Sequence, residues 1–336
     1  MHHFPSAGAL ILAILIAVAL VGARMASRPA LPPPLPPIPM ADSARSSEWT
    51  AEDWRVLVAK VQWGISERLD TLPLGDAVAR LGETFVGATY TPATLEVPGP
   101  ERVVVNLREL DCVTFIENVL ALVRLIREDG DAALSAPVEA KARYESYLRD
   151  LRYRGGVLAG YPSRLHYFSE WLSDNEARGR LRQLGRELGG ELDREPIDFM
   201  STHAKSYRQL SEPGVLDAIR AVEARLSAGE GRWYLPEDRI ASVAERIRDG
   251  DLIAATSTVK GLDIAHTGIA LWKSGKLYLL HAPLVGESVE ISELPLAERI
   301  QSIAGQDGIM VGRPMESPGR DTPRTRSDSS FSSAQD

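Results

Sequence analysis

The clearest periodic pattern of hydrophobic positions lies in residues 111–128. At 100° per residue, five side chains fall on one face, as in an amphipathic α-helix. They are Cys112, Ile116, Val119, Val123 and Ile126. Asp111 is a good N-cap, because its carboxylate can accept hydrogen bonds from the free amides of the first turn. The pattern predicts a helix that begins at Cys112 and leaves Glu117 on its polar, solvated face.

Helical spacing also predicts helices before and after this one, whereas the C-terminal part of the chain has the pattern of strands. The predicted helices cover 50–82, 137–152, 164–190, 213–228 and 237–248. The predicted strands cover 251–255, 264–272, 276–282 and 288–291, with a further short strand at 103–105. Helices first and an antiparallel meander last indicate an α+β fold.

Two histidines lie on a predicted hairpin. If the turn lies within residues 273–276, each residue of the first strand pairs with the residue of the second strand whose number brings the sum of the two to 549. Gly268 then faces His281, and His266 shares that face diagonally. The register therefore predicts two imidazoles side by side on the sheet.

The two ends of the chain differ from its body. An apolar run of 15 residues, Ala9 to Ala23, has the length of a signal-peptide core, whereas a membrane-spanning helix needs about 20. We expect residues 1–23 to be a cleaved signal peptide, with an uncleaved membrane tether as the alternative, and either reading exports the protein to the periplasm or cell envelope. The chain then divides into a Pro-rich linker over 24–47, a folded body over 48–313 with a mostly helical insertion at about 130–248, and a disordered tail over 314–336.

Composition excludes several classes of function. The net charge of −8 argues against binding to nucleic acid. The chain has one cysteine, which excludes an intrachain disulfide and a thiolate zinc cluster. It has six histidines and no His-Glu-x-x-His pattern, which disfavours a zinc amidase. We expect neither a metal nor a cofactor.

The single cysteine and the paired histidines suggest nucleophilic chemistry. A helix N-terminus can lower the pKa of a thiol, and its amides can donate to an oxyanion. A thiol nucleophile also needs a base, and the base needs a partner that fixes its tautomer. The alternatives are structural: Cys112 as a small buried hydrophobe, and His266 and His281 as ordinary core or surface residues.

Three ordered blocks resemble the NlpC-type cell-wall peptidases of papain-like fold. The first block is a Gly-x-x-Tyr loop ending at Tyr90, followed by Asp111-Cys112; the second is 249–253, and the third joins 266–270 to His281-Ala282. Further segments resemble one exported branch of that group, the N-acetylmuramoyl-L-alanine amidase-like family. These segments are 110–117, 164–168 with Trp171, 198–201 with His203 and Tyr207, and 261–268.

The resemblance implies a hydrolase that acts on peptidoglycan-derived muropeptides at the bond between N-acetylmuramic acid and L-alanine. It implies Cys112 as the nucleophile, His266 as the base and His281 as the orienting residue. The candidates for substrate binding are Tyr90, Glu96, Arg164, His166, Tyr167, Trp171, His203, Tyr207 and Asp263. For Tyr167 and Trp171 a core position is the stronger alternative, and for Asp263 a role in ordering the strand of His266. A γ-D-glutamyl-diamino acid endopeptidase and a non-catalytic peptidoglycan-binding module of the same fold remain open.

Overall fold

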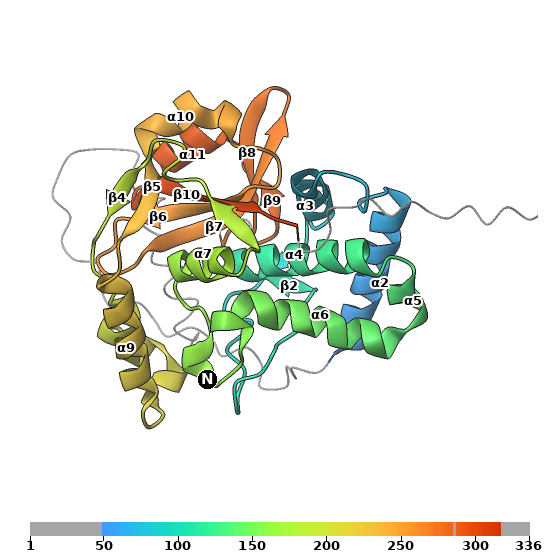
Figure 1. The fold of residues 1–336 in the computed structure, drawn as a ribbon, viewed down its shortest axis with the longest axis horizontal. Coiled ribbons are helices and arrows are strands. Elements are labelled where there is room, and N and C mark those ends of the chain that lie inside the picture. Colours follow the sequence, from blue (N-terminus) through green and yellow to red (C-terminus); the bar gives the residue numbers. More distant parts are fainter. Residues whose placement is uncertain (1–48, 285–286, 317–336) are drawn as a thin grey trace, which may run out of the picture.

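A large antiparallel sheet and a group of helices make up the part of the chain that the computed structural model describes, residues 49–284 and 287–316 (Figure 1). The α-helices are α2 (Ala51–Ser66), α3 (Leu74–Glu83), α4 (Cys112–Glu128), α5 (Ala132–Ser135), α6 (Pro137–Arg152), α7 (Phe168–Ala177), α8 (Phe199–Thr202), α9 (Val215–Ser227), α10 (Ile240–Val243) and α11 (Leu296–Ser302). The strands are β1 (Thr89–Tyr90), β2 (Glu109–Leu110), β3 (Leu181–Gln183), β4 (Glu191–Asp193), β5 (Arg232–Pro236), β6 (Leu252–Ser257), β7 (Ile264–Lys273), β8 (Lys276–His281), β9 (Glu290–Ile291) and β10 (Gln306–Pro314). The α+β prediction is confirmed.

The main sheet has eight strands in the order β4-β5-β10-β6-β7-β8-β9, and β3 pairs with β10 beside this path. The predicted meander is present as β6 to β9. The sequence pattern missed β10, which lies in the middle of the sheet, as well as β3, β4 and β5. Because β3 to β5 lie within 130–248, that segment adds strands to the sheet as well as helices.

The hairpin register is the predicted one. Ile269 pairs with Leu280 and Lys273 with Lys276, so the residue numbers add up as expected. Ser274 and Gly275 both have positive φ, at 50° and 76°. Two positive φ values in a two-residue loop match the right-handed twist of the flanking strands, which fixes the register.

The prediction of one helix over 50–82 was wrong. The chain leaves α2 through Arg68, whose φ is 58°, and Pro73 stands before the first residue of α3. A left-handed residue and a proline both end an α-helix.

Other helices differ from prediction in length. The predicted helix over 164–190 is shortened to α7, because Gly179 (φ 69°) turns the chain toward β3. The helix over 237–248 is reduced to α10 with short 3₁₀ turns on either side. The helices predicted over 111–128, 137–152 and 213–228 are confirmed as α4, α6 and α9.

No strand forms at 103–105. The carbonyl oxygen of Val104 instead accepts a hydrogen bond from Arg152, and that of Asn106 accepts one from Asn118. Buried side chains of α6 and α4 therefore take the place of a neighbouring strand at these two carbonyl oxygens.

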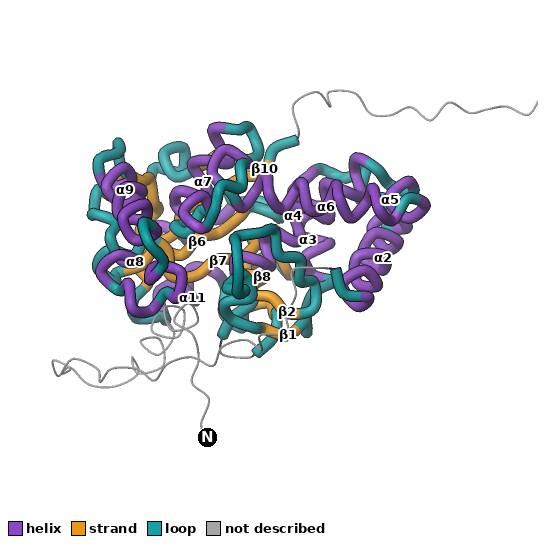
Figure 2. The backbone as a smooth tube through the Cα atoms, turned by 90° about the horizontal axis from the view of Figure 1, so that it is seen from below, coloured by secondary structure: helices purple, strands orange, loops and turns teal. Residues whose placement is uncertain are grey.

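Helices cover both faces of the sheet, so its central strands are buried on both sides. Figure 2 shows the strands between α2, α5 and α6 at one end and α8 and α9 at the other. On one face, Leu252, Ile269 and Leu280 join a cluster with residues of α3, α4 and α7. On the other face, Ile253, Ala270 and Leu279 pack with Ile240 of α10 and with Leu296 and Ile300 of α11.

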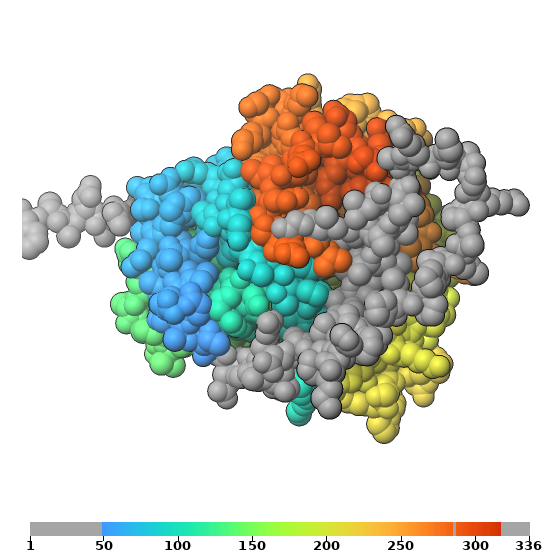
Figure 3. Space-filling model, turned by 180° about the vertical axis from the view of Figure 1, so that it is seen from behind, coloured from blue at the N-terminus to red at the C-terminus, as the bar shows by residue number. Residues whose placement is uncertain are grey.

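The first face demands close packing. A β-carbon at Gly82 of α3 would lie 2.9 Å from Leu280 Cδ2, so that glycine lets the helix approach β8. From behind, the blue and cyan surface of the N-terminal helices abuts the orange and red surface of the C-terminal strands (Figure 3).

The termini of the chain are only partly described. Segments 1–23 and 24–47 and most of the tail lie outside the described residues, but Pro314 still belongs to β10 and pairs with Leu181. Within 49–284 and 287–316, no helix has the length and apolar character needed to cross a bilayer.

Candidate active site

Cys112 is the first residue of α4, and Asp111 caps the helix as predicted. The Asp111 carboxylate accepts hydrogen bonds from the amides of Val113 (3.1 Å) and Thr114 (2.7 Å), and the Thr114 hydroxyl accepts one from the Asp111 amide (2.9 Å). This cap uses two of the first-turn amides that could otherwise donate to an oxyanion. The amide of Cys112 itself is not used by the cap.

Burial dominates the electrostatics of the thiol. Only 5% of Cys112 is exposed. Burial, followed by the negative charge of Asp111, raises the pKa of the Cys112 thiol to about 12, and hydrogen bonds from Thr267 oppose the rise only in part. A helix N-terminus can lower the pKa of a thiol, but at Cys112 the loss of solvent outweighs the effects that lower it.

His266 and His281 are neighbours, as the register predicted. His266 Nε2 lies 2.8 Å from His281 Nδ1, with the two rings at 83° to each other. Burial, and then the charge of Arg299, lowers the pKa of His266 well below 6.5; burial, His266 and Arg299 lower that of His281. Both rings are therefore neutral at pH 7, and one of them donates a hydrogen bond to the other across this contact.

Strand β7 is tied to the start of α4 beside this pair. The hydroxyl of Thr267, the residue after His266, donates to the carbonyl oxygen of Cys112 at 2.9 Å. Cys112 and His266 consequently line the same open cavity, of about 230 Å³. His281 lies behind His266 and does not line it.

Most of the predicted binding residues line this cavity. They are Tyr90, Glu96, Arg164, His166, Tyr167, Tyr207 and Asp263. Tyr90 is only 6% exposed, and its hydroxyl has no hydrogen-bond partner within residues 49–284 and 287–316. Burial, Cys112 and Asp111 together raise its pKa above the usual range. Tyr90 thus holds its proton beside the thiol and can donate it in a hydrogen bond.

Several wall residues are already engaged. Arg164 donates to Glu96 at 2.6 Å and lies 3.4 Å from Glu101, so it is not a free cation. The Tyr167 hydroxyl donates to Glu223 at 2.7 Å. These contacts fix the wall of the cavity, and they pair the charge of Arg164 with that of Glu96.

Two of the predicted binding residues lie outside the cavity lining. His203 is exposed, stacks on Phe199 and has its Nδ1 2.9 Å from the Phe199 carbonyl oxygen. Trp171 is 1% exposed and stacks on Phe168, which matches the core alternative.

Asp263 lines the cavity but is held by the backbone. It accepts hydrogen bonds from the amides of Ser169 and Ile264 at 2.7 and 2.8 Å. It therefore joins the start of β7 to α7, as the strand-ordering alternative supposed.

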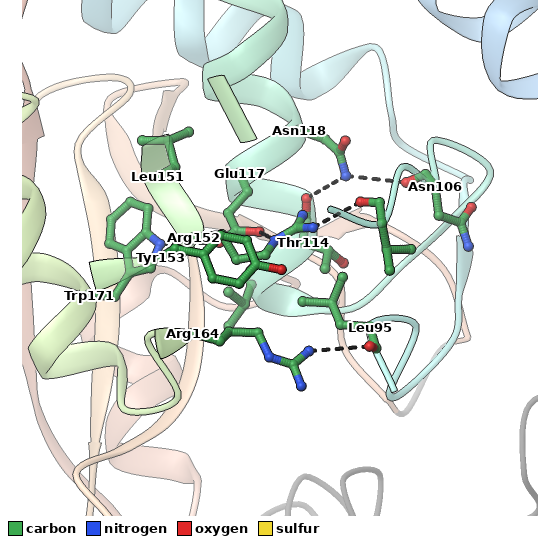
Figure 4. Close-up of polar contacts among 12 residues, drawn as sticks. Leu95, Asn106, Thr114, Glu117, Asn118, Leu151, Arg152, Tyr153, Arg164 and Trp171 are labelled. Carbon is green, nitrogen blue, oxygen red and sulfur yellow. Dashed lines mark hydrogen bonds and ion pairs between the residues drawn. The ribbon is translucent and has the colours of Figure 1, made fainter. Parts of the chain in front are cut away.

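The prediction for Glu117 was wrong. It is 1% exposed, accepts a hydrogen bond from Arg152 Nε at 2.8 Å and another from Trp171 Nε1 at 3.2 Å. Figure 4 shows the Glu117 carboxylate between these two side chains, which come from α6 and α7. A helical wheel places Glu117 opposite the core of α4 but cannot show that two further helices cover that side.

A profile of the N-acetylmuramoyl-L-alanine amidase-like family matches residues 80–309, more than half of the chain. The chain belongs to this family. No curated protein matches it.

Solved structures agree with this amidase-like assignment. An N-acetylmuramoyl-L-alanine amidase from Bacteroides uniformis shares 33% identity and a TM-score of 0.65, over 72% of this chain and 99% of its own. A putative xylanase from Bacteroides fragilis shares 32% identity and a TM-score of 0.63, over 69% and 98%. A Legionella pneumophila protein at 18% identity, with a TM-score of 0.55 over 79% and 95%, supports the fold alone.

Sequence reasoning missed part of the site of this amidase-like chain. Arg152, Glu117 and Tyr161 also line the cavity. Arg152 and Glu117 occur at positions where charged residues are common on helices. Nothing in the local sequence distinguishes them from solvent-exposed charged residues. In the described ranges, no three His, Cys, Asp or Glu side chains gather in a way that could hold a metal ion.

The stability of this amidase-like fold should depend on His166. Burial, and then Arg164, lowers the pKa of His166 well below 6.5. Below about pH 6.5 this histidine is therefore protonated in the unfolded chain but still neutral in the folded chain. As the pH decreases, the free energy of unfolding should decrease by up to about 1.4 kcal/mol per pH unit because of this residue. His166→Asn should reduce that slope in urea titrations between pH 7.5 and 5.5. The exposed His203→Asn is the matched control, and equal slopes in wild type and His166→Asn would contradict the prediction.

Proposed function

We propose that this protein is a cysteine amidase with a papain-like, NlpC-type core, which cleaves the N-acetylmuramoyl-L-alanine bond of peptidoglycan fragments. One observation carries the proposal: Cys112 and His266 line one cavity, and His281 lies 2.8 Å behind His266. A nucleophile, a base and an orienting partner then occur in the required order. The family membership supports the choice of bond.

Both partners are neutral before substrate binds, because burial raises the pKa of the thiol and lowers that of the imidazole. His266 accepts the thiol proton as Cys112 Sγ attacks the amide carbon, so the charged pair forms only during the reaction. A thiol that stays protonated in the free protein also resists adventitious oxidation.

The negative oxygen of the tetrahedral intermediate needs donors. The amide of Cys112, which the Asp111 cap does not use, and the Tyr90 hydroxyl, which has no partner among the described residues, are the donors that we assign to this task. Collapse of the intermediate expels the amine of L-alanine, which takes the proton from His266. Water then attacks the thioester, His266 accepts a proton from that water, and the carboxylic acid is released with the thiol restored.

Export belongs to the same proposal. The apolar run from Ala9 to Ala23 would bring the protein to the periplasm or cell envelope, where peptidoglycan fragments occur.

The test is product analysis by mass spectrometry on muropeptides with and without the sugar. We expect release of free stem peptide from the sugar-bearing substrate, no reaction with sugar-free peptide, and full activity in a chelator. Cleavage of sugar-free peptide after D-glutamate would replace the amidase with the endopeptidase. No cleavage of either substrate would favour a binding module and overturn the proposal.

A further inference from the structure

The far side of the histidine pair is unsatisfied. His281 is 1% exposed and uses Nδ1 toward His266, but its Nε2 has no hydrogen-bond partner among the described residues. A buried ring nitrogen without a partner is unusual, and it leaves the tautomer of His281 undetermined by its contacts.

The Glu290 carboxylate lies close to this nitrogen. It lies directly opposite His281 in the register of β8 and β9, and directly opposed residues of antiparallel strands share a face. His281 Nε2 lies 3.7 Å from Glu290 Oε1, which is longer than a hydrogen bond. The Glu290 side chain is 41% exposed, so it has the freedom to rotate into contact.

Arg299 approaches from α11, above the same sheet face. His266 and His281 alternate in phase with Ala270 and Leu279, the residues that pack against α11. Arg299 Nη1 is also buried, and it has no hydrogen-bond partner in the described part of the chain. Burial is the main cause of the lowered pKa of both imidazoles, and the charge of Arg299 adds to it. Burial also lowers the pKa of Arg299, to about 10, and the charge of Glu290 opposes that change only in part.

We propose that Glu290 and Arg299 are positioning residues that decide which nitrogens of His266 and His281 carry protons. The inference rests on the proposed function, in which His266 is the base. Each neutral imidazole bears one N–H. When Glu290 accepts from His281 Nε2–H, His281 Nδ1 must accept from His266 Nε2–H, and His266 Nδ1 keeps its lone pair for the thiol proton.

Without Glu290 the opposite arrangement is equally accessible. His281 Nδ1–H then donates to His266 Nε2, which puts the proton of His266 on Nδ1 and blocks it as a base. The two charges also act with opposite sign on the imidazolium that forms in the reaction. Glu290 stabilises it, and Arg299 opposes it and holds the pair neutral at rest.

The test combines ¹⁵N NMR of the imidazoles with the pH profile of kcat. The variants are Glu290→Gln and Arg299→Gln, with Glu290→Asp and Arg299→Lys as charge-conserving rescues. Burial raises the pKa of Glu290, and the charge of Glu293 adds to the rise. Because Glu293 is exposed, Glu293→Gln is the matched control. His266→Asn and His281→Asn assign the resonances.

We expect both histidines of the wild type to be Nε2–H tautomers. Glu290→Gln should populate the Nδ1–H forms, move the protonation midpoint of the pair down by about half a pH unit and lower kcat about 10- to 100-fold. Arg299→Gln should move the midpoint up. Both rescue variants and Glu293→Gln should stay near wild type.

The outcomes separate this inference from the proposed function. NMR needs no substrate, so the expected tautomer changes in a protein that cleaves no muropeptide would overturn the amidase and keep the positioning role. Midpoints that move in the same direction in both variants, or a loss of kcat in Glu290→Gln with unchanged tautomers, would overturn the positioning role. If Arg299→Gln does not fold, the tautomers of Glu290→Gln alone decide.

Discussion

Replacing Cys112 with alanine is expected to lower kcat for muropeptide cleavage at least about 10³-fold, with KM changed much less. Without sulfur, no thioester can form, and the remaining amide and Tyr90 donors can stabilise only direct attack by water. Because the thiol is 5% exposed and alanine removes a single atom, the fold should persist. The measurement is the initial rate on a defined muropeptide, together with thermal unfolding of both proteins.

Cys112→Ser is the companion variant. It keeps the shape of the site but has a far weaker acid in place of the thiol, so it should also be nearly inactive. The chain has one cysteine, so an acyl adduct found by mass spectrometry of the quenched wild-type protein is assigned without ambiguity. Activity of Cys112→Ala within tenfold of wild type, or an adduct on another residue, would rule out the thiol mechanism.

Local signals were enough to predict the parts of the site that depend on short stretches of chain. The start of α4 followed from the Asp111 cap and the apolar face, and the contact of His266 with His281 followed from a two-residue turn. A turn and a cap each determine geometry within a few residues, so pattern and structure agree there.

The parts that were missed depend on residues far apart in the sequence. Strand β10 reads as a short apolar run between polar residues, and it becomes a central strand only because β6, β5 and β3 pair with it. The raised pKa of Cys112 has the same origin. A helix N-terminus is visible in the sequence, but the burial that outweighs it comes from the packing of the rest of the chain.

The buried pair of Glu117 and Arg152 shows the same limit and allows a second large prediction. The pair joins α4, which carries Cys112, to α6, and Trp171 adds α7 (Figure 4). Glu117 and Arg152 side chains are 1% and 3% exposed. Removing one partner leaves the other charge buried and uncompensated, which costs about 3–5 kcal/mol.

Glu117→Gln should therefore lower the free energy of unfolding by about 3–5 kcal/mol and Tm by about 6–20 °C. Arg152→Met should cost a similar amount at pH 7.5 but less at pH 5.5. Burial already raises the pKa of Glu117, and without Arg152 it rises further, so the folded state takes up a proton more readily as the pH falls. Urea titrations at both pH values measure these changes.

A double variant separates the pair from simple loss of packing. Glu117→Leu with Arg152→Met replaces both charges by apolar groups. It should recover much of the stability lost in either single variant, because the double variant leaves no uncompensated buried charge. The exposed pair of Glu52 and Arg55 is the control, and Glu52→Gln should change the free energy of unfolding by less than about 0.5 kcal/mol. Additive losses in the double variant would mean that Glu117 and Arg152 act independently. If the double variant is stable but its kcat is lower than that of wild type, the pair also holds α4, and with it Cys112, in the position that catalysis needs.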